Sequence, residues 1–489
     1  MSRRSVAPLA VLAVLAVLVT GCITGVKVGA RCRTTDFGAD STFVLKCQRG
    51  RWVRVATKVQ VARLLFAILE AQRSTVPNVV GQSIESAAAG FTAAGLSVGT
   101  ATPVVSSTAP GTVLGTEPAA GSRANRGTKV SVTTSNGRGV KAMATGNAHS
   151  CAVIGTGEVR CWGYNVYGQL GNNSTANSAT PVTVVGLTGA TAVDVFDGHS
   201  CAIVAGGEVR CWGFNGYGQL GNGTTSRSSV PVPVTGIANA TAIGLGVFFS
   251  CALISGGTVK CWGQNGVGQL GDGTTNQSLV PVVVSTINDA VSIGAGRGFA
   301  CVIVTSGAVK CWGYGGQGQL GNGSSTGSYT PVSATGVTGA TSFAGWDQGC
   351  VIVAAGAVRC WGYNSSGELG DGSTTNSLEA IGTGLTGAIS VGAGEYTSCA
   401  TFGDGSAKCW GLNNLGQIGN GTTTNSSTPE SVTGLSGATA ISPGGGHTCA
   451  VTSSGLTSGV VRCWGRNDVG ELGNATLVNS SVPVSAVDM

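Results

Sequence analysis

The chain has 489 residues, which is long enough for two or three domains, and only 10% of them are charged, whereas Gly occurs 82 times and Cys 17 times. This composition excludes a disordered chain, which would be rich in charge and poor in apolar residues, and it favours short strands joined by tight turns. Residues 1–73 carry 12 Lys and Arg against 3 Asp and Glu, and residues 74–489 carry 15 against 18, so charge excludes nucleic acid as the partner of the larger part.

The N-terminus has the layout of an export signal. Arg3 and Arg4 precede an apolar run from Val6 to Val19 that is too short to span a bilayer. The run ends in Val19-Thr20-Gly21-Cys22, which resembles the lipobox of bacterial lipoproteins. We therefore expect residues 1–21 to be a signal peptide and Cys22 to be lipidated, which would anchor the chain at the outer face of the cell membrane. An ordinary signal peptide or a twin-arginine signal is the alternative.

Residues 22–74 form a basic segment with its own pair of cysteines. Cys32 and Cys47 stand apart from the other cysteines and predict one local disulfide. The stretch from Val59 to Gln72 has apolar residues at helical spacing and predicts a helix. The basic side chains around this helix suit either anionic lipid or wall polymer, or else a solvated connector.

Residues 75–136 resemble a PASTA domain. A helix is expected from Ser83, a suitable N-cap, to Gly95, a suitable residue just beyond its C-terminus. The resemblance implies a small α+β domain associated with peptidoglycan, acting either as a wall sensor or as a passive spacer. The matching motifs are Val76-Pro77-Asn78-Val79-Val80-Gly81, Pro110-Gly111-Thr112-Val113 and Gly127-Thr128-Lys129-Val130-Ser131-Val132.

Residues 138–489 consist of seven repeats with a period of 49 or 50 residues. Each repeat has two cysteines, then Trp-Gly, then Gly-Gln-Leu-Gly or a near variant. Seven units with several short strand signals each predict an all-β domain, a seven-bladed β-propeller. The repeats resemble the regulator-of-chromosome-condensation repeat family, which implies the same fold. The resemblance is carried by motifs such as His199-Ser200-Cys201-Ala202-Ile203 and Trp212-Gly213-Phe214-Asn215-Gly216-Tyr217-Gly218-Gln219-Leu220-Gly221-Asn222-Gly223.

The two cysteines of each repeat flank a hairpin, where they face each other within disulfide reach. Seven such bridges, one Cys32–Cys47 bridge and a lipidated Cys22 account for all 17 cysteines. Export favours the oxidised form, and the hairpins lack the Cys-x-x-Cys spacing of zinc sites. The predicted pairs are Cys151–Cys161, Cys201–Cys211, Cys251–Cys261, Cys301–Cys311, Cys350–Cys360, Cys399–Cys409 and Cys449–Cys463.

The ends of the repeat array suggest how the ring closes. A strand at Val140–Met143 precedes the first cysteine hairpin, while the last repeat stops at Met489 with no strand after it. We expect the N-terminal strand to complete the seventh blade and so to leave no open sheet edge.

Function is expected where the blades differ, because residues that recur in every blade serve the shared scaffold. A second candidate patch follows Trp-Gly, but we assign it to the scaffold because its aromatic type repeats from blade to blade. Its residues are Tyr164, Tyr167, Phe214, Tyr217, Tyr314 and Tyr363. The loop before the first cysteine varies most, and its equivalents lie around one rim, so we predict a partner-binding surface there. Alternatively, some of its aromatic residues plug the channel mouth. The predicted residues are His149, Asp197, His199, Phe248, Phe249, Arg297, Phe299, Trp346, Asp347, Glu395, Tyr396 and His447.

Nothing in the sequence points to catalysis, so we predict a protein that binds and is not an enzyme. The sequence has no Walker loop and no His-Glu-x-x-His. A metal site on the three histidines is disfavoured, because equivalent positions on separate blades lie too far apart to share an ion; we expect no metal and no cofactor.

The family resemblance is compatible with several partners. Its nuclear member is an exchange factor for a small GTPase, a role that export makes implausible here. We expect a monomeric surface lipoprotein whose propeller binds a protein or a wall glycan, and not nucleic acid. The alternative is a secreted inhibitor of a cell-wall enzyme or β-lactamase, which resemblance to a secreted bacterial seven-bladed member of the family implies.

Overall fold

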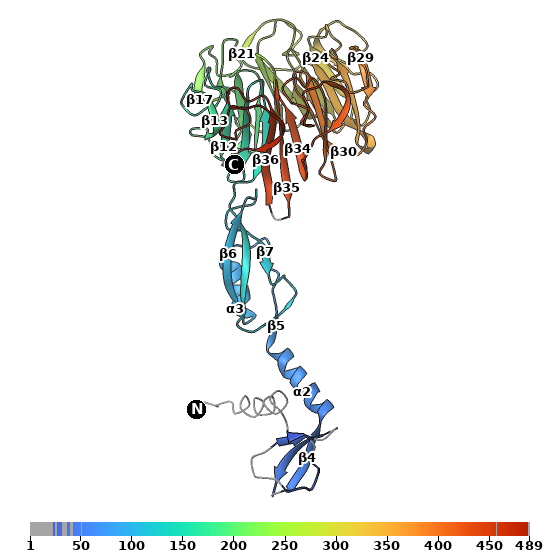
Figure 1. The fold of residues 1–489 in the computed structure, drawn as a ribbon. Coiled ribbons are helices and arrows are strands. Elements are labelled where there is room, and N and C mark those ends of the chain that lie inside the picture. The colour runs from blue at the N-terminus through green and yellow to red at the C-terminus, as the bar shows by residue number, and fades with distance from the viewer. Residues whose placement is uncertain are drawn as a thin grey trace. The chain divides into compact units, whose positions relative to one another are not determined.

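The structure is a computed structural model that describes residues 23–24, 27–31, 37–39, 43–49, 51–455 and 457–487 (Figure 1). The chain divides into two compact units, one reaching Ala101 and including Gly115–Val132, the other holding Thr102–Leu114 and everything from Thr133 onward. Cys22 and Cys32 lie outside the described residues, so lipidation and the Cys32–Cys47 bridge stay predictions. No helix within the described ranges is long and apolar enough to cross a membrane.

The first described elements are a small sheet and a helix. Strands β1 (Ile23–Thr24), β2 (Phe37–Ala39), β3 (Phe43–Gln48) and β4 (Arg51–Thr57) form the sheet, which buries Leu45, Cys47 and Trp52. Helix α2 (Lys58–Ala71) follows where the helical spacing predicted it. It begins at a capping box, because the Gln60 N–H donates to the Thr57 hydroxyl and the Thr57 N–H donates to the Gln60 side chain.

Residues 73–135 mix one helix with two small sheets. Helix α3 (Ile84–Ala93) starts at Ser83, whose hydroxyl accepts from the Ser86 N–H, and it buries Ala87 and Phe91. Strands β5 (Arg73–Thr75) and β8 (Arg123–Asn125) pair with each other, and β6 (Ser97–Val104), β9 (Lys129–Ser135) and β7 (Val113–Glu117) form a three-stranded sheet in that order.

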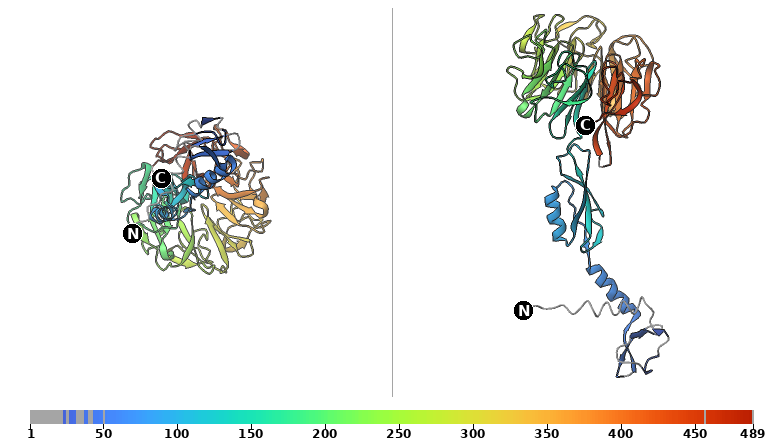
Figure 2. Two further views of the ribbon diagram at one scale, coloured as in Figure 1. Left: turned by 90° about the horizontal axis from the view of Figure 1, so that it is seen from below. Right: turned by 60° about the vertical axis from the view of Figure 1, so that its left-hand side comes forward.

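The remaining residues form seven four-stranded antiparallel sheets arranged as the blades of a propeller (Figure 2). Their strands, blade by blade, are β10 (Val140–Thr145), β11 (His149–Ile154), β12 (Val159–Gly163), β13 (Ser178–Thr183); β14 (Ala192–Val195), β15 (His199–Ile203), β16 (Val209–Gly213), β17 (Ser228–Pro233); β18 (Ala240–Leu245), β19 (Phe249–Ile254), β20 (Val259–Gly263), β21 (Ser278–Val283); β22 (Ala290–Ala295), β23 (Phe299–Val304), β24 (Val309–Gly313), β25 (Ser328–Ser333); β26 (Ser342–Gly345), β27 (Gln348–Val353), β28 (Ala357–Gly362), β29 (Ser377–Gly382); β30 (Ala388–Ala393), β31 (Thr397–Phe402), β32 (Ala407–Gly411), β33 (Ser426–Ser431); β34 (Ala438–Pro443), β35 (His447–Ser454), β36 (Thr457–Gly465) and β37 (Ser480–Ser485). Two short 3-10 turns, η1 (Ala205–Gly207) and η2 (Ala354–Gly356), lie in hairpin turns.

Each blade places its first strand at the central channel. The first strands of all seven blades line a channel of about 430 Å³. The second strands are almost wholly buried, and the fourth strands are the most exposed. The hydrophobic cores lie between adjacent blades, as where Cys151 and Val159 of the first blade pack against Val193 and Trp212 of the second.

The seven predicted hairpin disulfides are confirmed. In each blade the two cysteines are directly opposed on the second and third strands, with Cα atoms 4.0–4.1 Å apart. Their side chains are wholly buried between blades, so each bridge joins two strands inside the core.

A tryptophan links each blade to the one before it. The indole N–H of Trp212 donates to the Gln169 carbonyl of the first blade, and all seven blades repeat this bond at 2.8–3.0 Å. Gly171 follows closely, with a φ of 66°, and a Cβ there would lie 2.8 Å from the indole nitrogen of Trp212. The recurrent Gln-Leu-Gly and Trp-Gly motifs are therefore the two halves of one contact between blades.

The ring closes differently from our prediction. Every blade consists of four consecutive strands, and β10 pairs with β11 in the first blade, so the N-terminal strand does not complete the seventh. The strand before each cysteine hairpin belongs to the same blade as the hairpin, because a loop of two or three residues returns it directly onto the hairpin. Hydrogen bonds close the ring instead: Trp162 donates to the Glu471 carbonyl, the Thr145 hydroxyl donates to the Ser442 carbonyl, and the Gly445 N–H donates to the Gly146 carbonyl.

Candidate binding surface at the channel mouth

Strand direction brings two sets of loops to one face of the propeller. The first and third strands of a blade run in the same direction, since each is antiparallel to the second. The loop after the first strand, such as 146–148, and the loop that follows Trp-Gly, such as 164–167, therefore open on the same side. The two loops touch, because the Tyr164 N–H donates to the Ala148 carbonyl at 2.8 Å.

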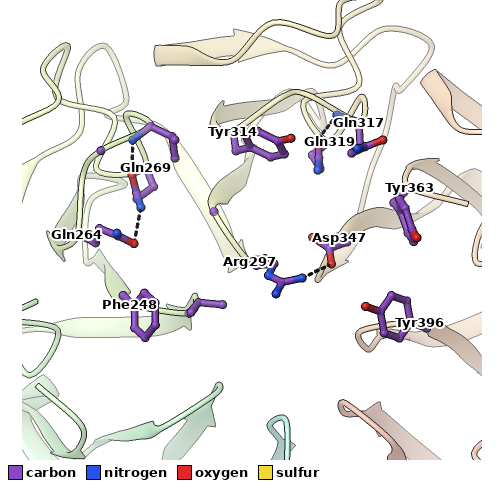
Figure 3. Close-up of a pocket in the computed structure, with 14 residues that line it drawn as sticks. Phe248, Gln264, Gln269, Arg297, Tyr314, Gln317, Gln319, Asp347, Tyr363 and Tyr396 are labelled. Atoms are coloured by element: carbon purple, nitrogen blue, oxygen red, sulfur yellow. Dashed lines mark hydrogen bonds and ion pairs between the residues drawn. The ribbon is translucent and has the colours of Figure 1, made fainter. Parts of the chain in front are cut away.

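These loops enclose a pocket of about 490 Å³ across the third to sixth blades (Figure 3). Four of the predicted residues, Phe248, Arg297, Asp347 and Tyr396, line it together. The prediction missed the residues contributed by the loops after Trp-Gly and by the turns that follow them. The other lining residues are Val247, Gln264, Gly266, Val267, Gln269, Gly298, Tyr314, Gln317, Gln319 and Tyr363.

An ion pair stands at the centre of this pocket. The Arg297 guanidinium lies 3.4 Å from the Asp347 carboxylate, and the Arg297 side chain is 57% exposed against 15% for Asp347. Burial raises the pKa of Asp347 and outweighs the opposing effect of Arg297. Burial works against the charge of Arg297, but Asp347 and Glu395 together outweigh it and raise the pKa of Arg297.

A smaller pocket of about 230 Å³ adjoins the channel mouth. Its polar lining includes Asp197 and Glu395, both predicted, and Asn147, which donates to the Asp197 carboxylate at 2.9 Å. Burial raises the pKa of Glu395, against the effects of a hydrogen bond from Tyr396 and the charge of Arg297.

Trp346 forms the floor of the smaller pocket and is not a surface contact. It is 4% exposed and stacks on Phe196 of the second blade, with ring centroids 4.1 Å apart. Both rings line the channel as well as standing at its mouth. Trp346 therefore plugs the channel mouth, which was the alternative given for the aromatic residues of the rim.

The predicted rim set and the aromatic residues assigned to the scaffold form one surface. Phe248 lies 4.8 Å from Tyr217 and 5.8 Å from Phe214, measured between ring centroids. Phe214 in turn lies 5.1 Å from Tyr167. The aromatic strip therefore runs from the first to the third blade and reaches the 490 Å³ pocket at Phe248.

Five residues predicted for the binding surface are buried instead. His149, His199, His447, Phe249 and Phe299 are at most 1% exposed. Each is the first residue of a second strand, where the side chain points between blades. The prediction was wrong for these residues because each of them already belongs to the strand and not to the loop before it.

The three histidines connect adjacent blades. The Nε2 atoms of His149 and His199 lie 2.9 Å from the hydroxyls of Ser200 and Ser250, and that of His447 lies 2.7 Å from the Ser150 hydroxyl. Burial lowers the pKa of each histidine to about 3, so all three are neutral near pH 7. Over the described ranges, no three His, Cys, Asp or Glu side chains are grouped so as to hold a metal ion.

Family models match both parts of the chain. The PASTA domain model matches residues 74–136. Two models of the regulator of chromosome condensation (RCC1) repeat match the propeller and together cover residues 140–319 and 388–471, which is more than half of the chain. No curated protein matches the chain.

Solved structures share the propeller fold. Yeast RCC1 (Prp20) bound to Kap60 is 20% identical with a TM-score of 0.60, over 68% of this chain and 84% of that one. Prp20p from Saccharomyces cerevisiae, studied for its binding to Gsp1p and histones, is 20% identical with a TM-score of 0.59, over 68% and 86%. Human WBSCR16 is 20% identical with a TM-score of 0.61, over 68% and 94%. At this identity the likeness shows the fold alone.

Proposed function

Because the chain belongs to the RCC1 repeat family and carries a PASTA domain ahead of its propeller, we propose that it is a non-catalytic binding protein of the cell envelope. In this proposal the rim around the channel mouth holds a protein or a wall glycan. The PASTA domain suggests peptidoglycan as a ligand, and seven disulfides suggest an extracytoplasmic location.

One observation carries the proposal, namely the 490 Å³ pocket and the aromatic strip that reaches it. The pocket combines exposed aromatic side chains with an ion pair, and Tyr314 is 41% exposed and Arg297 57%. Tyrosine and arginine are, with tryptophan, the residue types most enriched among the residues that dominate binding in protein interfaces. A pocket of this size, with a few convergent polar groups, is also the usual form of a ligand site.

Anchoring at the membrane is part of the proposal. It is supported by the sequence Val19-Thr20-Gly21-Cys22 at the end of the apolar run. The known members of the fold add a precedent but no partner. The solved yeast protein is bound to Kap60, and at 20% identity that partner is not carried over to this chain.

The proposal is tested by capture of partners with the full oxidised chain. The chain is incubated with wall fragments and, separately, with solubilised envelope proteins, and captured material is identified by mass spectrometry. A rim variant carries Arg297→Ala, Tyr314→Ala and Tyr396→Ala. A control carries Tyr329→Ala, since Tyr329 is 51% exposed on β25 of the fourth blade and outside the pocket lining.

We expect the wild-type chain and the control to capture the same partner and the folded rim variant to lose it. Capture that survives in the rim variant would show that the rim is not the binding surface. A panel of purified wall enzymes and β-lactamases, assayed with the same proteins, separates simple binding from the inhibitor alternative.

A further inference from the structure

We propose that the 490 Å³ pocket of the third to sixth blades binds a neutral glycan of N-acetylated amino sugars. The inference rests on the proposed function and deepens it, because it assigns a ligand class to this pocket and favours glycan over protein. It is carried by the polar groups that converge in the pocket, by the balance of their charge and by its aromatic walls.

Gln319 supplies a fixed donor that has no partner among the described residues. Its side chain is 1% exposed, and its Oε1 accepts from the Gln317 N–H at 2.8 Å, which sets the orientation of the amide. Its amide nitrogen makes no hydrogen bond to any described residue, and it faces the pocket (Figure 3). The equivalent amide nitrogens of Gln169 and Gln219 are also unpaired but are buried outside the pocket lining, whereas that of Gln319 opens into the pocket, where it can donate to an acceptor on a ligand.

The other polar groups provide acceptors as well as donors. The Gln264 Oε1 accepts from the Gln269 amide at only 3.4 Å and has capacity for a further donor. Arg297 donates to Asp347 at 3.4 Å and has further N–H groups exposed to the pocket. The hydroxyl and acetamido groups of an amino sugar can each donate and accept hydrogen bonds. They therefore suit a pocket whose amides, phenols and ion pair offer both donors and acceptors.

The charged side chains of the pocket favour a neutral ligand over an ionic one. Arg297 and Asp347 are the charged side chains that line the pocket, and they pair with each other. An anionic polymer would meet Asp347 and, at the edge, Glu395, whose charges act on Arg297. A cationic ligand would meet the exposed Arg297 guanidinium.

The aromatic walls suit the apolar faces of sugar rings. The ring centroids of Tyr363 and Tyr396 lie 6.1 Å apart on one side of the pocket, and Tyr314 and Phe248 line other sides. A concave site with polar side chains fixed in advance is typical of a small rigid ligand, whereas protein interfaces are larger surfaces without such a pocket.

The chain itself offers a conservative test of the Gln319 donor. Glu368 and Glu471 occupy the same place in the fifth and seventh blades, and each accepts the equivalent N–H, from Ser366 at 2.8 Å and from Val469 at 3.0 Å. Gln319→Glu therefore preserves the bond that holds the turn and replaces only the donor. Gln219→Glu is the matched control, because Gln219 makes the same bond in the second blade and lies outside the pocket lining.

The experiment titrates the full oxidised chain with a tetramer of N-acetylglucosamine at pH 8, where a glutamate is ionised, and measures heat by calorimetry. The deacetylated tetramer serves as the ligand control. We expect the acetylated tetramer to bind, Gln219→Glu to leave its Kd unchanged, and Gln319→Glu to weaken it at least about tenfold. Tyr314→Ala, at an exposed position, should weaken binding as well and covers the case in which Gln319→Glu fails to fold.

Absence of binding by the acetylated tetramer would overturn the inference. So would a Kd that neither Gln319→Glu nor Tyr314→Ala changes, since the glycan would then bind elsewhere, as on the PASTA domain. If the rim variant loses an envelope protein while the chain ignores the glycan, the proposed binding function stands and this ligand assignment fails. If neither partner is captured, both fail.

Discussion

Two adjacent residues, Phe248 and Phe249, show how finely the candidate surface depends on position. Phe248 lies in the loop and lines both pockets of the rim, whereas Phe249 begins β19 and is fully buried. The same boundary separates Asp347 from Gln348 in the fifth blade. The sequence shows that these loops are variable and rich in large side chains. It does not show at which residue the strand begins, because aromatic residues are compatible with either environment.

The three neutral histidines buried between blades make the free energy of unfolding depend on pH. The pKa of an unfolded histidine is near 6.5, and burial lowers it to about 3 in the three folded sites. Between these values the unfolded chain binds more protons, so the free energy of unfolding decreases as the pH falls from 6.5 towards 3. Each histidine contributes up to about 1.4 kcal/mol per pH unit in that window.

Replacing the histidines with glutamine should flatten this dependence. Gln348 stands at the equivalent position of the fifth blade and donates to the Ser398 hydroxyl at 3.0 Å, so His149→Gln, His199→Gln and His447→Gln retain a donor. We expect thermal unfolding of wild type and variant to differ little at pH 7.5 and to diverge as the pH falls to 4.5. Asp194, whose pKa burial raises to about 7, has the opposite pH dependence, but it is present in both proteins and cancels. Parallel curves would contradict the assignment.

At the scale of elements, the cysteine hairpins were predicted, whereas the face shared by the two sets of loops was missed although strand direction determines it. A spacing of ten residues with glycines in the turn leaves one register for opposed cysteines, and the structure has that register in each blade with that spacing. Tyr314 and Tyr363 were assigned to the scaffold because aromatic residues recur there. Counting strand directions within a blade would have placed both on the face of Phe248 and Arg297, since first and third strands end on the same side.

One hairpin bridge can be removed to measure its contribution. Cys251→Ala with Cys261→Ala opens a loop with a sequence separation of 10 residues in the third blade. Loop-closure entropy predicts a loss of about 3 kcal/mol in the free energy of unfolding, with a further loss from the cavity that the two sulfur atoms leave. Denaturant unfolding under oxidising conditions measures the loss. Unchanged stability would show that the other six bridges and the packing between blades make this one redundant.

For the whole molecule, the repeat predicted how many blades there are but not where each one begins. A period of about 50 residues is the same from any starting point, so Val140–Met143 reads equally well as the last strand of one blade or the first of another. The structure assigns it to the first blade, and the seventh blade ends with its own fourth strand, β37. No strand is exchanged between the first and last blades. Their interface therefore depends on packing and on hydrogen bonds of side chains and backbone, such as the one from the Gly445 N–H to the Gly146 carbonyl, without a covalent connection.

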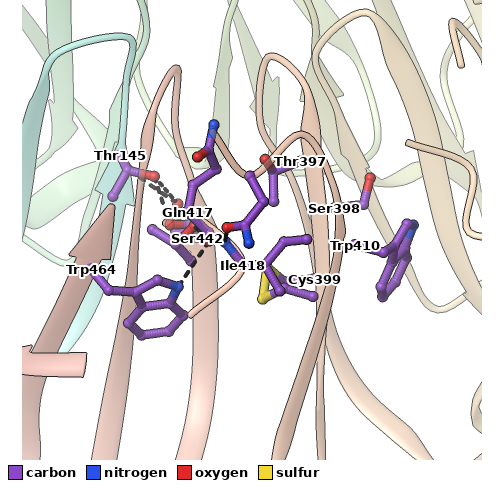
Figure 4. Close-up of a disulfide and its surroundings, with 12 residues drawn as sticks. Thr145, Thr397, Ser398, Cys399, Trp410, Gln417, Ile418, Ser442 and Trp464 are labelled. Carbon is purple, nitrogen blue, oxygen red and sulfur yellow. Dashed lines mark hydrogen bonds between the residues drawn. A yellow bond between two sulfur atoms is a disulfide. The ribbon is translucent and has the colours of Figure 1, made fainter. Parts of the chain in front are cut away.

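This closure should be the point where the ring opens most easily. Thr145 and Ser442 lie on the first strands of blades one and seven, and the Thr145 N–H and hydroxyl both bond to Ser442 (Figure 4). At the interface of blades two and three, the Asp194 carboxylate accepts from the Leu245 N–H, as the Ser442 hydroxyl accepts from the Thr145 N–H at the closure. Blades two and three are, however, also joined covalently, because the chain continues from β17 to β18. We expect Thr145→Val with Ser442→Ala to reduce the free energy of unfolding by about 2 kcal/mol.

Hydrogen exchange distinguishes opening at the closure from general weakening. In the closure variant, amide exchange should become faster mainly in β10 and in β34 to β37, because these blades can separate while the rest of the ring stays assembled. Asp194→Ala is the control, and its effect should stay smaller and close to β14 and β18, since the covalent connection limits separation there. Equal acceleration across all seven blades in both variants would show that the propeller opens as one unit and that the site of closure has no special weakness.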